Sequence, residues 1–146
     1  MTNLGDRRAR IAAHLAGHAI GVSISFGAGA INGYPAMPWS ADGQQAMMGE
    51  CKAAIDIKGD DFAQRTKPPT KGQQFVASGI PFACNRDSAT ARYFIARGFT
   101  PAVPDDVTRW FSRGYWEETR QFAERLRPGL TLAAVGRTYR DWIDRL

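Results

Sequence analysis

The chain has 146 residues, of which 44% are hydrophobic and 23% are charged, and this suits one ordinary globular domain with a workable core. No apolar run approaches the roughly 20 residues of a membrane span, and two cysteines are too few for a disulfide framework. The net charge of +5 favours an anionic partner, although the arginines are scattered and lack the interleaved aromatic residues typical of single-strand binding.

The N-terminal segment, residues 6–16, has the periodicity of a helix with one apolar face. It is charged and has no apolar h-region behind it, so we expect no secretory signal and a cytoplasmic location. His14 and His18 are four residues apart and would share a helical face, as zinc ligands can. The supporting glutamate of a metalloprotease motif is absent, so we interpret both as ordinary histidines.

Short apolar segments alternate with helical ones through the middle of the chain. We expect strands at residues 22–26, 53–57, 81–85 and 99–103, and helices near 44–52, 71–78 and 88–97. Asp87 or Ser88 should cap the last of these helices. This alternation predicts an α/β fold, a compact doubly wound parallel sheet with helices on both faces. We therefore assign residues 1–146 to a single Rossmann-like domain with a helical C-terminal tail, residues 104–146.

The tail is expected to be helical to its end. Pro104 and the two aspartates after it suit a helix start. The aromatic stripe between residues 107 and 116 is more typical of a core or an interface than of a cofactor site. Residues 127–129 should break the helix, and Thr131 should cap the last one. One face of that last helix is apolar and consists of Leu132, Val135, Tyr139, Trp142 and Ile143.

The stretch from residue 67 to residue 81 carries the clearest chemistry. Two prolines hold a loop extended, a short helix follows, and a buried strand begins. We expect Thr70 to cap this helix with its hydroxyl and Gly79 to end it in the left-handed conformation. Positive charge gathers at the helix N-terminus from three side chains, those of Arg65, Lys67 and Lys71. Because free amides and the helix dipole already favour an anion there, the pattern predicts a phosphate site at the carboxyl edge of a parallel sheet.

The same stretch resembles a motif of the GT-B glycosyltransferases. A basic Lys-Pro-x-x-Lys run, a short helix that ends in Ala-Ser-Gly, then Ile-Pro and a hydrophobic strand are similar to the C-terminal, donor-binding half of that superfamily. In those proteins the pattern follows a strand that ends in aspartate, which corresponds here to Asp56. Many members have a glutamate five residues before the glycine. This chain has Gln74 there, which keeps the hydrogen bonding but loses the charge.

The resemblance implies that the chain is the donor-binding half of a glycosyltransferase and binds the diphosphate of a nucleotide sugar. The diphosphate would be neutralised by Arg65, Lys67 and Lys71. Thr70 and the amides near Gly72 would add hydrogen bonds, and Gln74 would face the ribose or the sugar. No cofactor and no metal is expected, because the nucleotide sugar is itself the substrate.

A GT-B enzyme also has a second α/β domain, which carries the catalytic base and the acceptor site. No residue here is a convincing general base, so we expect the lone chain to be incomplete as an enzyme and to need a second α/β domain or subunit. Nucleic acid is not expected as a partner, and membrane contact is expected to be peripheral at most.

Two alternatives stay open. The first is a non-enzymatic α/β module that binds a nucleotide, or a partner protein through the aromatic tail. The second is a basic domain that binds nucleic acid. Residues 59–61, Gly-Asp-Asp, could also supply a metal-binding carboxylate pair. Nothing else provides ligands at a fixed spacing, so a solvated loop is the preferred interpretation of that segment.

Overall fold

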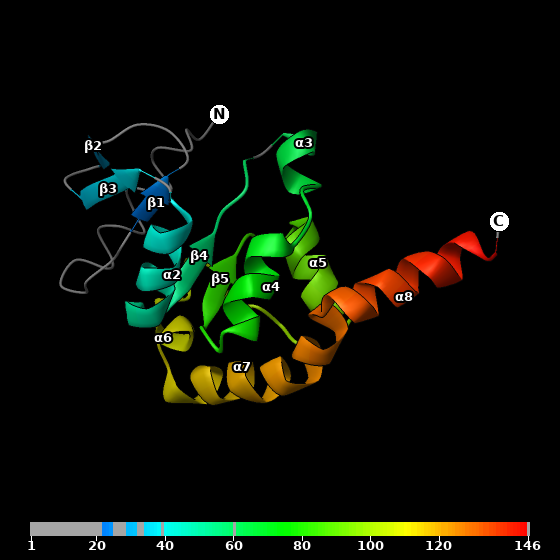
Figure 1. The fold of residues 1–146 in the computed structure, drawn as a ribbon. Coiled ribbons are helices and arrows are strands. Elements are labelled where there is room, and N and C mark those ends of the chain that lie inside the picture. The colour runs from blue at the N-terminus through cyan, green and yellow to red at the C-terminus, as the bar shows by residue number, and fades with distance from the viewer. Residues whose placement is uncertain (1–21, 25–28, 32–33, 39, 60, 146) are drawn as a thin grey trace.

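The computed structural model describes residues 22–24, 29–31, 34–38, 40–59 and 61–145. Figure 1 shows how the helices and strands of this part are arranged, and its labels are used below. The predicted N-terminal helix and the pair His14 and His18 lie outside the described residues.

Three short strands near the N-terminus form a sheet of their own, in the order β1-β3-β2. They are β1 (Val22–Ile24), β2 (Gly29–Ile31) and β3 (Tyr34–Pro38). β1 runs parallel to β3, with Val22 opposite Ala36, and β2 runs antiparallel to β3. Residues 34 and 35 belong to β3, the central strand, and face β2. This local pairing closes a shorter loop than pairing with residues 53–57 would, and shorter loops cost less entropy.

A second sheet, of two strands, lies in the middle of the described part. β4 (Ala54–Asp56) and β5 (Phe82–Cys84) are parallel, with Ala54 opposite Phe82. The predicted parallel pairing of these two segments is confirmed. The predicted fold class is wrong, because the described part is mostly helical and its two-stranded parallel sheet is not a compact doubly wound sheet with helices on both faces.

Residues 99–103, expected as a further parallel strand, form only a single bridge, between Ala102 and Ala83 of β5. The Ala102 carbonyl accepts a bond from the Cys84 amide at 3.0 Å, but the Ala102 amide donates to the Tyr115 hydroxyl at 2.9 Å. Pro101 has no amide to donate. The segment therefore lacks the free donors that a longer ladder needs.

Helices make up most of the described part. They are α2 (Ala41–Glu50), α3 (Phe62–Arg65), α4 (Thr70–Ala77), α5 (Ala89–Ile95), α6 (Val107–Trp110), α7 (Arg113–Leu126), the 3-10 helix η1 (Arg127–Leu130) and α8 (Leu132–Ile143). Ser88 caps α5 and Thr131 caps α8, and both predictions are confirmed. Gly79 follows α4 with φ of +73°, as predicted, because a residue without Cβ adopts this conformation without strain.

The core joins β5, α5 and α7 through aromatic side chains. The ring centre of Phe82 in β5 lies 5.1 Å from that of Phe94 in α5, and Phe99 lies 4.8 Å from Phe122 of α7. The hydroxyl of Tyr115 in α7 donates to the Phe82 carbonyl at 2.7 Å. Ring burial and this hydrogen bond together hold α7 against the sheet.

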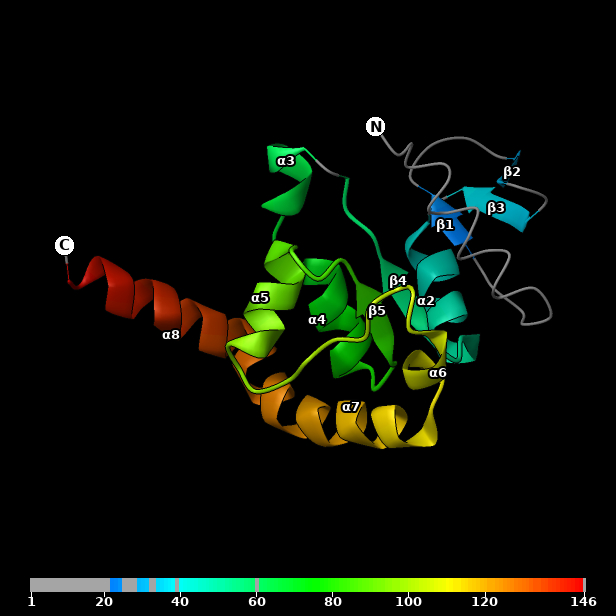
Figure 2. The same ribbon diagram turned by 180° about the vertical axis from the view of Figure 1, so that it is seen from behind.

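The last helix, α8, extends away from the rest of the chain in both views (Figures 1 and 2). Pro128 interrupts the helical run in η1, between α7 and α8, in line with the predicted break. The apolar face predicted for the last helix is largely exposed, with Leu132 93% and Tyr139 64% accessible. By contrast, Trp110 and Tyr115 of the predicted aromatic stripe are buried in the core.

Candidate functional site

The carboxyl ends of β4 and β5 lie at one edge of the two-stranded sheet, because parallel strands end on the same side. We call this the carboxyl edge. Figures 1 and 2 both show α3 beyond this edge and α4 beginning beside it. Ligands of open α/β sheets bind at such edges, so the side chains there are the first candidates for a site.

Asp56, the last residue of β4, forms a buried ion pair with Lys58. Its carboxylate lies 2.8 Å from the Lys58 ammonium and accepts a hydrogen bond from the Thr90 hydroxyl at 3.2 Å. All three residues are buried. Because each buried charge needs a partner and hydrogen bonds, this cluster holds the edge together and leaves neither charge free for a ligand.

Asn85 and Ser88 join the two strand ends. The Asn85 side-chain oxygen accepts a bond from the Lys58 amide at 2.6 Å, which links the segment after β5 to the segment after β4. The Ser88 hydroxyl donates to the Asn85 carbonyl at 2.7 Å and accepts from the Ala91 amide at 3.1 Å. These bonds set the position of the start of α5 at the carboxyl edge.

α4 begins at the carboxyl edge without a side-chain cap. Pro69 is the N-cap residue and Thr70 is the first residue inside the helix, so the prediction that Thr70 caps α4 is wrong. The reason is Pro69, whose φ of −76° and ψ of 20° already bend the chain towards the helix before Thr70 can take the capping position. The first-turn amides have no partner within the helix, which leaves this end suited to an anion.

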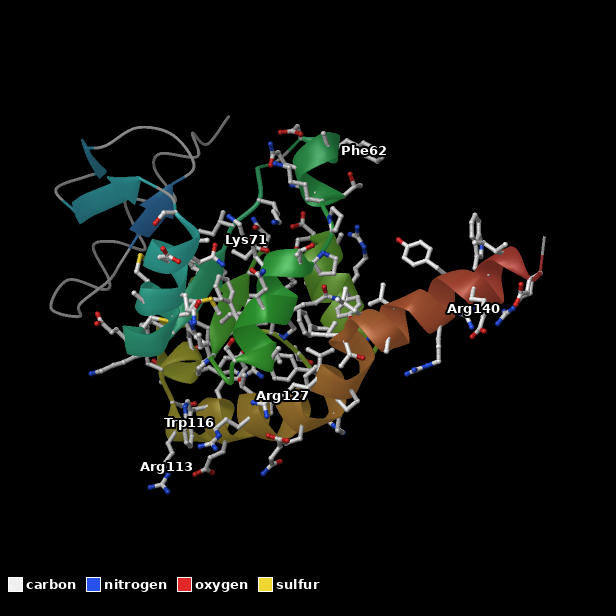
Figure 3. The ribbon with its side chains drawn as sticks, viewed as in Figure 1. Phe62, Lys71, Arg113, Trp116, Arg127 and Arg140 are labelled. Carbon is white, nitrogen blue, oxygen red and sulfur yellow. The ribbon has the colours of Figure 1, made fainter. Side chains whose placement is uncertain are left out.

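The three predicted cations differ in their surroundings. Lys67 and Lys71 are exposed, and neither forms an ion pair with any of the described residues. Figure 3 shows Lys71 at the start of α4. Arg65 is ion-paired with Asp87, in the turn that follows β5. The positive charge available to a ligand therefore comes mainly from the two lysines, while Asp87 partly neutralises Arg65 and holds it near the edge.

Gly72 faces the core. A Cβ at this position would lie 2.9 Å from the side chains of both Phe94 and Thr90, so the glycine is what allows α4 to pack closely against α5. Gln74 is exposed, and its side-chain oxygen accepts a bond from Gln44 of α2 at 3.4 Å. Gly72 and Gln74 thus contact other helices. Of the predicted site residues, Lys67, Thr70 and Lys71 are exposed at the edge, and none of their side chains forms a hydrogen bond with another of the described helices.

The thiols do not suit nucleophilic chemistry. Both cysteines are free, and Cys84 is buried at the end of β5. Burial raises the pKa of the Cys84 thiol to about 12, and the Asp56 carboxylate contributes to the rise, while Ser88 and Lys58 oppose it. Burial also raises the pKa of Cys51. Because the thiolate is the reactive form, a raised pKa makes both thiols less reactive near neutral pH, and Cys84 the more so because it is buried.

Three polar residues at this edge were missed from the sequence: Lys58, Asn85 and Arg86. Each follows the end of a parallel strand by one or two residues. Residues directly after parallel strands converge at the carboxyl edge. Polar residues at these positions could therefore have been predicted as part of the edge from the predicted strands alone. Arg86 is exposed and adds a further cation to the edge.

Two hollows in the described part lie away from the carboxyl edge. One, of about 310 Å³, lies between α5, α7 and η1, and the other, of about 330 Å³, follows α8. No three His, Cys, Asp or Glu side chains of the described residues gather as a metal site. Asp61 instead caps α3, where it accepts a bond from the Gln64 amide at 2.9 Å. None of the described helices is long and apolar enough to cross a membrane.

Comparison of the chain with protein-family models, curated proteins and solved structures finds no match. The resemblance to GT-B glycosyltransferases, and the residue roles that it implies, therefore stay predictions.

Proposed function

We propose that the carboxyl edge binds the diphosphate of a nucleotide sugar and that the chain is the donor-binding half of a glycosyltransferase. The supporting observation is the position of Lys67 and Lys71, which are both exposed and lie at the uncapped start of α4. The first-turn amides, the helix dipole and two ammonium groups would then act on one anion. Thr70 is exposed beside them, and its hydroxyl can donate to a phosphate oxygen.

Arg65 and Arg86 would extend this positive edge towards β5. The ion pair with Asp87 orients the Arg65 guanidinium, and Arg86 is exposed two residues after β5. A diphosphate has several charged oxygens spread along its length. Cations that lie apart from one another can therefore bind a diphosphate better than they can bind a single phosphate. Gln74, one turn along α4, stays the proposed contact to the ribose or the sugar.

The described residues at this edge supply no general base for sugar transfer. The Asp56 carboxylate is occupied by Lys58 and Thr90, and the Cys84 thiol stays protonated. We therefore propose that a second α/β domain or subunit provides the base and the acceptor site, and that the isolated chain transfers no sugar. No cofactor is required in this scheme. We place the protein in the cytoplasm, where both free thiols would stay reduced.

Replacement of Lys71 by alanine tests the site. Lys71→Ala should weaken the binding of uridine or guanosine diphosphate roughly tenfold to hundredfold, since a charge-assisted contact contributes about 1.5–3 kcal/mol. The matched control is Lys52→Ala, which removes an exposed lysine just before β4, at the opposite edge of the sheet. Its removal should change the affinity by less than about threefold, because only a screened long-range term is lost. Calorimetric titration measures both variants against the same ligand.

Equal affinities of the two variants would refute the phosphate site. Turnover of a nucleotide sugar by this chain alone, with an acceptor present, would refute the claim that a second domain supplies the base. Tighter binding of a mixed oligonucleotide than of the diphosphate would favour a nucleic-acid-binding domain instead.

A second candidate function is a module that binds a protein through its C-terminal helix. The observation in its favour is the exposed apolar face of α8, which takes no part in the carboxyl edge. If no nucleoside diphosphate binds while α8 mediates the binding of a different protein, this alternative is the better account.

A further inference from the structure

α8 carries an apolar stripe that the rest of the described chain leaves exposed. The accessible fractions are 93% for Leu132, 40% for Val135, 64% for Tyr139, 61% for Trp142 and 60% for Ile143. Large apolar side chains offer roughly 150–250 Å² each, so the stripe exposes on the order of 600 Å². That is as large as the largest apolar patch of most soluble monomers, and such patches usually mark an interaction site.

The stripe has the spacing of a coiled-coil seam. Leu132, Val135, Tyr139 and Trp142 follow one another at intervals of three, four and three residues, which is the alternation of a and d positions in a heptad. Ile143 widens the same face. The seam covers two heptads, which is short, so its partner must match it closely along its whole length.

The second hollow of the structure lies on this seam. It measures about 330 Å³ and is lined by Val135, Thr138, Tyr139 and Trp142. Residues spaced i, i+3, i+4 and i+7 form the four-residue hole that accepts one side chain of a facing helix in a coiled coil. α8 therefore presents both the projecting side chains and a hole that can receive one.

We propose that α8 pairs antiparallel with α8 of a second copy of this chain, about a two-fold axis that crosses the seam at the level of residue 137. In this arrangement Val135 lies opposite Tyr139 of the second copy, and Leu132 lies opposite Trp142 of the second copy. Each aromatic ring then meets a smaller aliphatic side chain, so the layers of the seam have similar volumes. Parallel pairing would instead set Trp142 against Trp142 and Val135 against Val135, which gives one overfilled layer and one underfilled layer.

The polar residues of α8 are compatible with this pairing. Arg137 and Asp141 lie on the side of the helix opposite the stripe, as the helical period requires. Gly136 and Thr138, which border the stripe, are small and uncharged, so a second helix can approach closely. Two such stripes would bury on the order of 1,200 Å², which is the lower end of specific protein interfaces. We therefore expect a reversible dimer with a dissociation constant in the micromolar range.

Sedimentation equilibrium of the full chain over a wide concentration range tests the pairing. The unchanged chain should show a reversible monomer–dimer equilibrium, and Val135→Asp should weaken it more than tenfold, because it places a carboxylate in an apolar seam. The control Ala133→Asp adds the same charge to an exposed position on the side of α8 away from the stripe and should leave the equilibrium within about threefold. Circular dichroism checks that both variants stay folded. A chain that remains monomeric, or two variants that weaken association equally, would overturn the proposal, whether or not α8 then binds lipid vesicles or another protein.

Cross-linking tests the direction of the helices. In a chain that carries Cys51→Ala, so that only buried Cys84 remains, the single variants Val135→Cys and Tyr139→Cys are mixed and oxidised. The antiparallel arrangement predicts that the mixed disulfide between the two variants forms faster than either disulfide between identical chains. Faster cross-linking of Val135→Cys to itself would mean a parallel pair and would overturn the arrangement. Neither experiment requires a nucleotide, so failure here is distinct from failure of the phosphate site.

Discussion

The carboxylate of Asp56 and the ammonium of Lys58 lie 2.8 Å apart, and the two residues are only 5% and 9% exposed. They are two positions apart in the sequence, at the point where β4 ends. Their charges compensate each other inside the protein. Among the described residues, the unpaired positive charge at the carboxyl edge consequently comes from exposed residues, chiefly Lys67 and Lys71, and the buried pair connects the end of β4 to the segment that follows it.

Asp56→Asn should destabilise the fold strongly. The substitution leaves the Lys58 ammonium buried without a counter-charge, and loss of one member of a buried pair costs about 3–5 kcal/mol. Urea unfolding followed by circular dichroism measures the change. The double variant Asp56→Asn with Lys58→Met removes both charges and should recover part of this loss. A single variant as stable as the unchanged chain would mean that the pair is solvated.

Gly72→Ala should lower stability even though alanine favours helices. The new methyl group would lie 2.9 Å from atoms of Phe94 and Thr90, and overpacking of this kind costs about 1–3 kcal/mol, which exceeds the gain of up to about 1 kcal/mol in helix propensity. Gly114→Ala in α7 is the matched control, because a Cβ there has no atom within 4 Å. The control should be neutral or stabilising in the same urea experiment. The close packing of α4 on α5 would be disproved by equal effects of the two changes.

Tyr115→Phe should destabilise the packing of residues 99–103 against β5 and α7. The hydroxyl donates to the Phe82 carbonyl at 2.7 Å and accepts from the Ala102 amide at 2.9 Å, so the change leaves two buried backbone groups without partners. We expect a loss of about 2–4 kcal/mol, since each unsatisfied group costs about 1–3 kcal/mol. Hydrogen exchange should speed up most at Ala102. Tyr93→Phe, which removes the hydroxyl of a half-buried ring, is the control and should change stability by less than about 0.5 kcal/mol.

The stability of the folded chain should fall as the pH rises above the pKa of an unfolded cysteine thiol. The pKa of Cys84 is raised to about 12 in the folded chain, whereas an unfolded thiol ionises near about 8.5. Between these values the folded state binds more protons than the unfolded state, so each step up in pH favours unfolding. We expect a loss of about 1–2 kcal/mol from this thiol between pH 8 and pH 10. Urea midpoints across that range measure it.

Cys84→Ala is the comparison for the pH experiment. Its stability should depend less on pH over the same range, because the alanine chain has no buried thiol at that position. Identical slopes for the two chains would mean that Cys84 is accessible to water. Thiol labelling gives an independent check: in the folded chain Cys84 should react only after unfolding, and half-buried Cys51 should react first.

Structural features that depend on residues close together in the chain could be predicted from the sequence. Ser88 and Thr131 cap their helices because a hydroxyl reaches an amide three residues on, and Gly79 ends α4 because its conformation requires no Cβ. The apolar face of α8 follows from helical spacing alone. The parallel pairing of β4 with β5 also followed, because a helix between two short apolar strands favours a parallel crossover.

Choices between distant partners were decided only by the tertiary structure. β1 pairs with β3 and not with β4, because the nearby strand β3 offers its backbone groups first. Residues 99–103 make only one bridge, because the Ala102 amide donates to the Tyr115 hydroxyl and not to a neighbouring strand. Gly72 faces the core and Lys58 is paired with Asp56 for the same kind of reason. The neighbours of a residue in the chain set its local conformation. The surface that its side chain contacts depends on helices and strands tens of residues away. A pattern of a few residues therefore does not predict which of these competing partners it will meet.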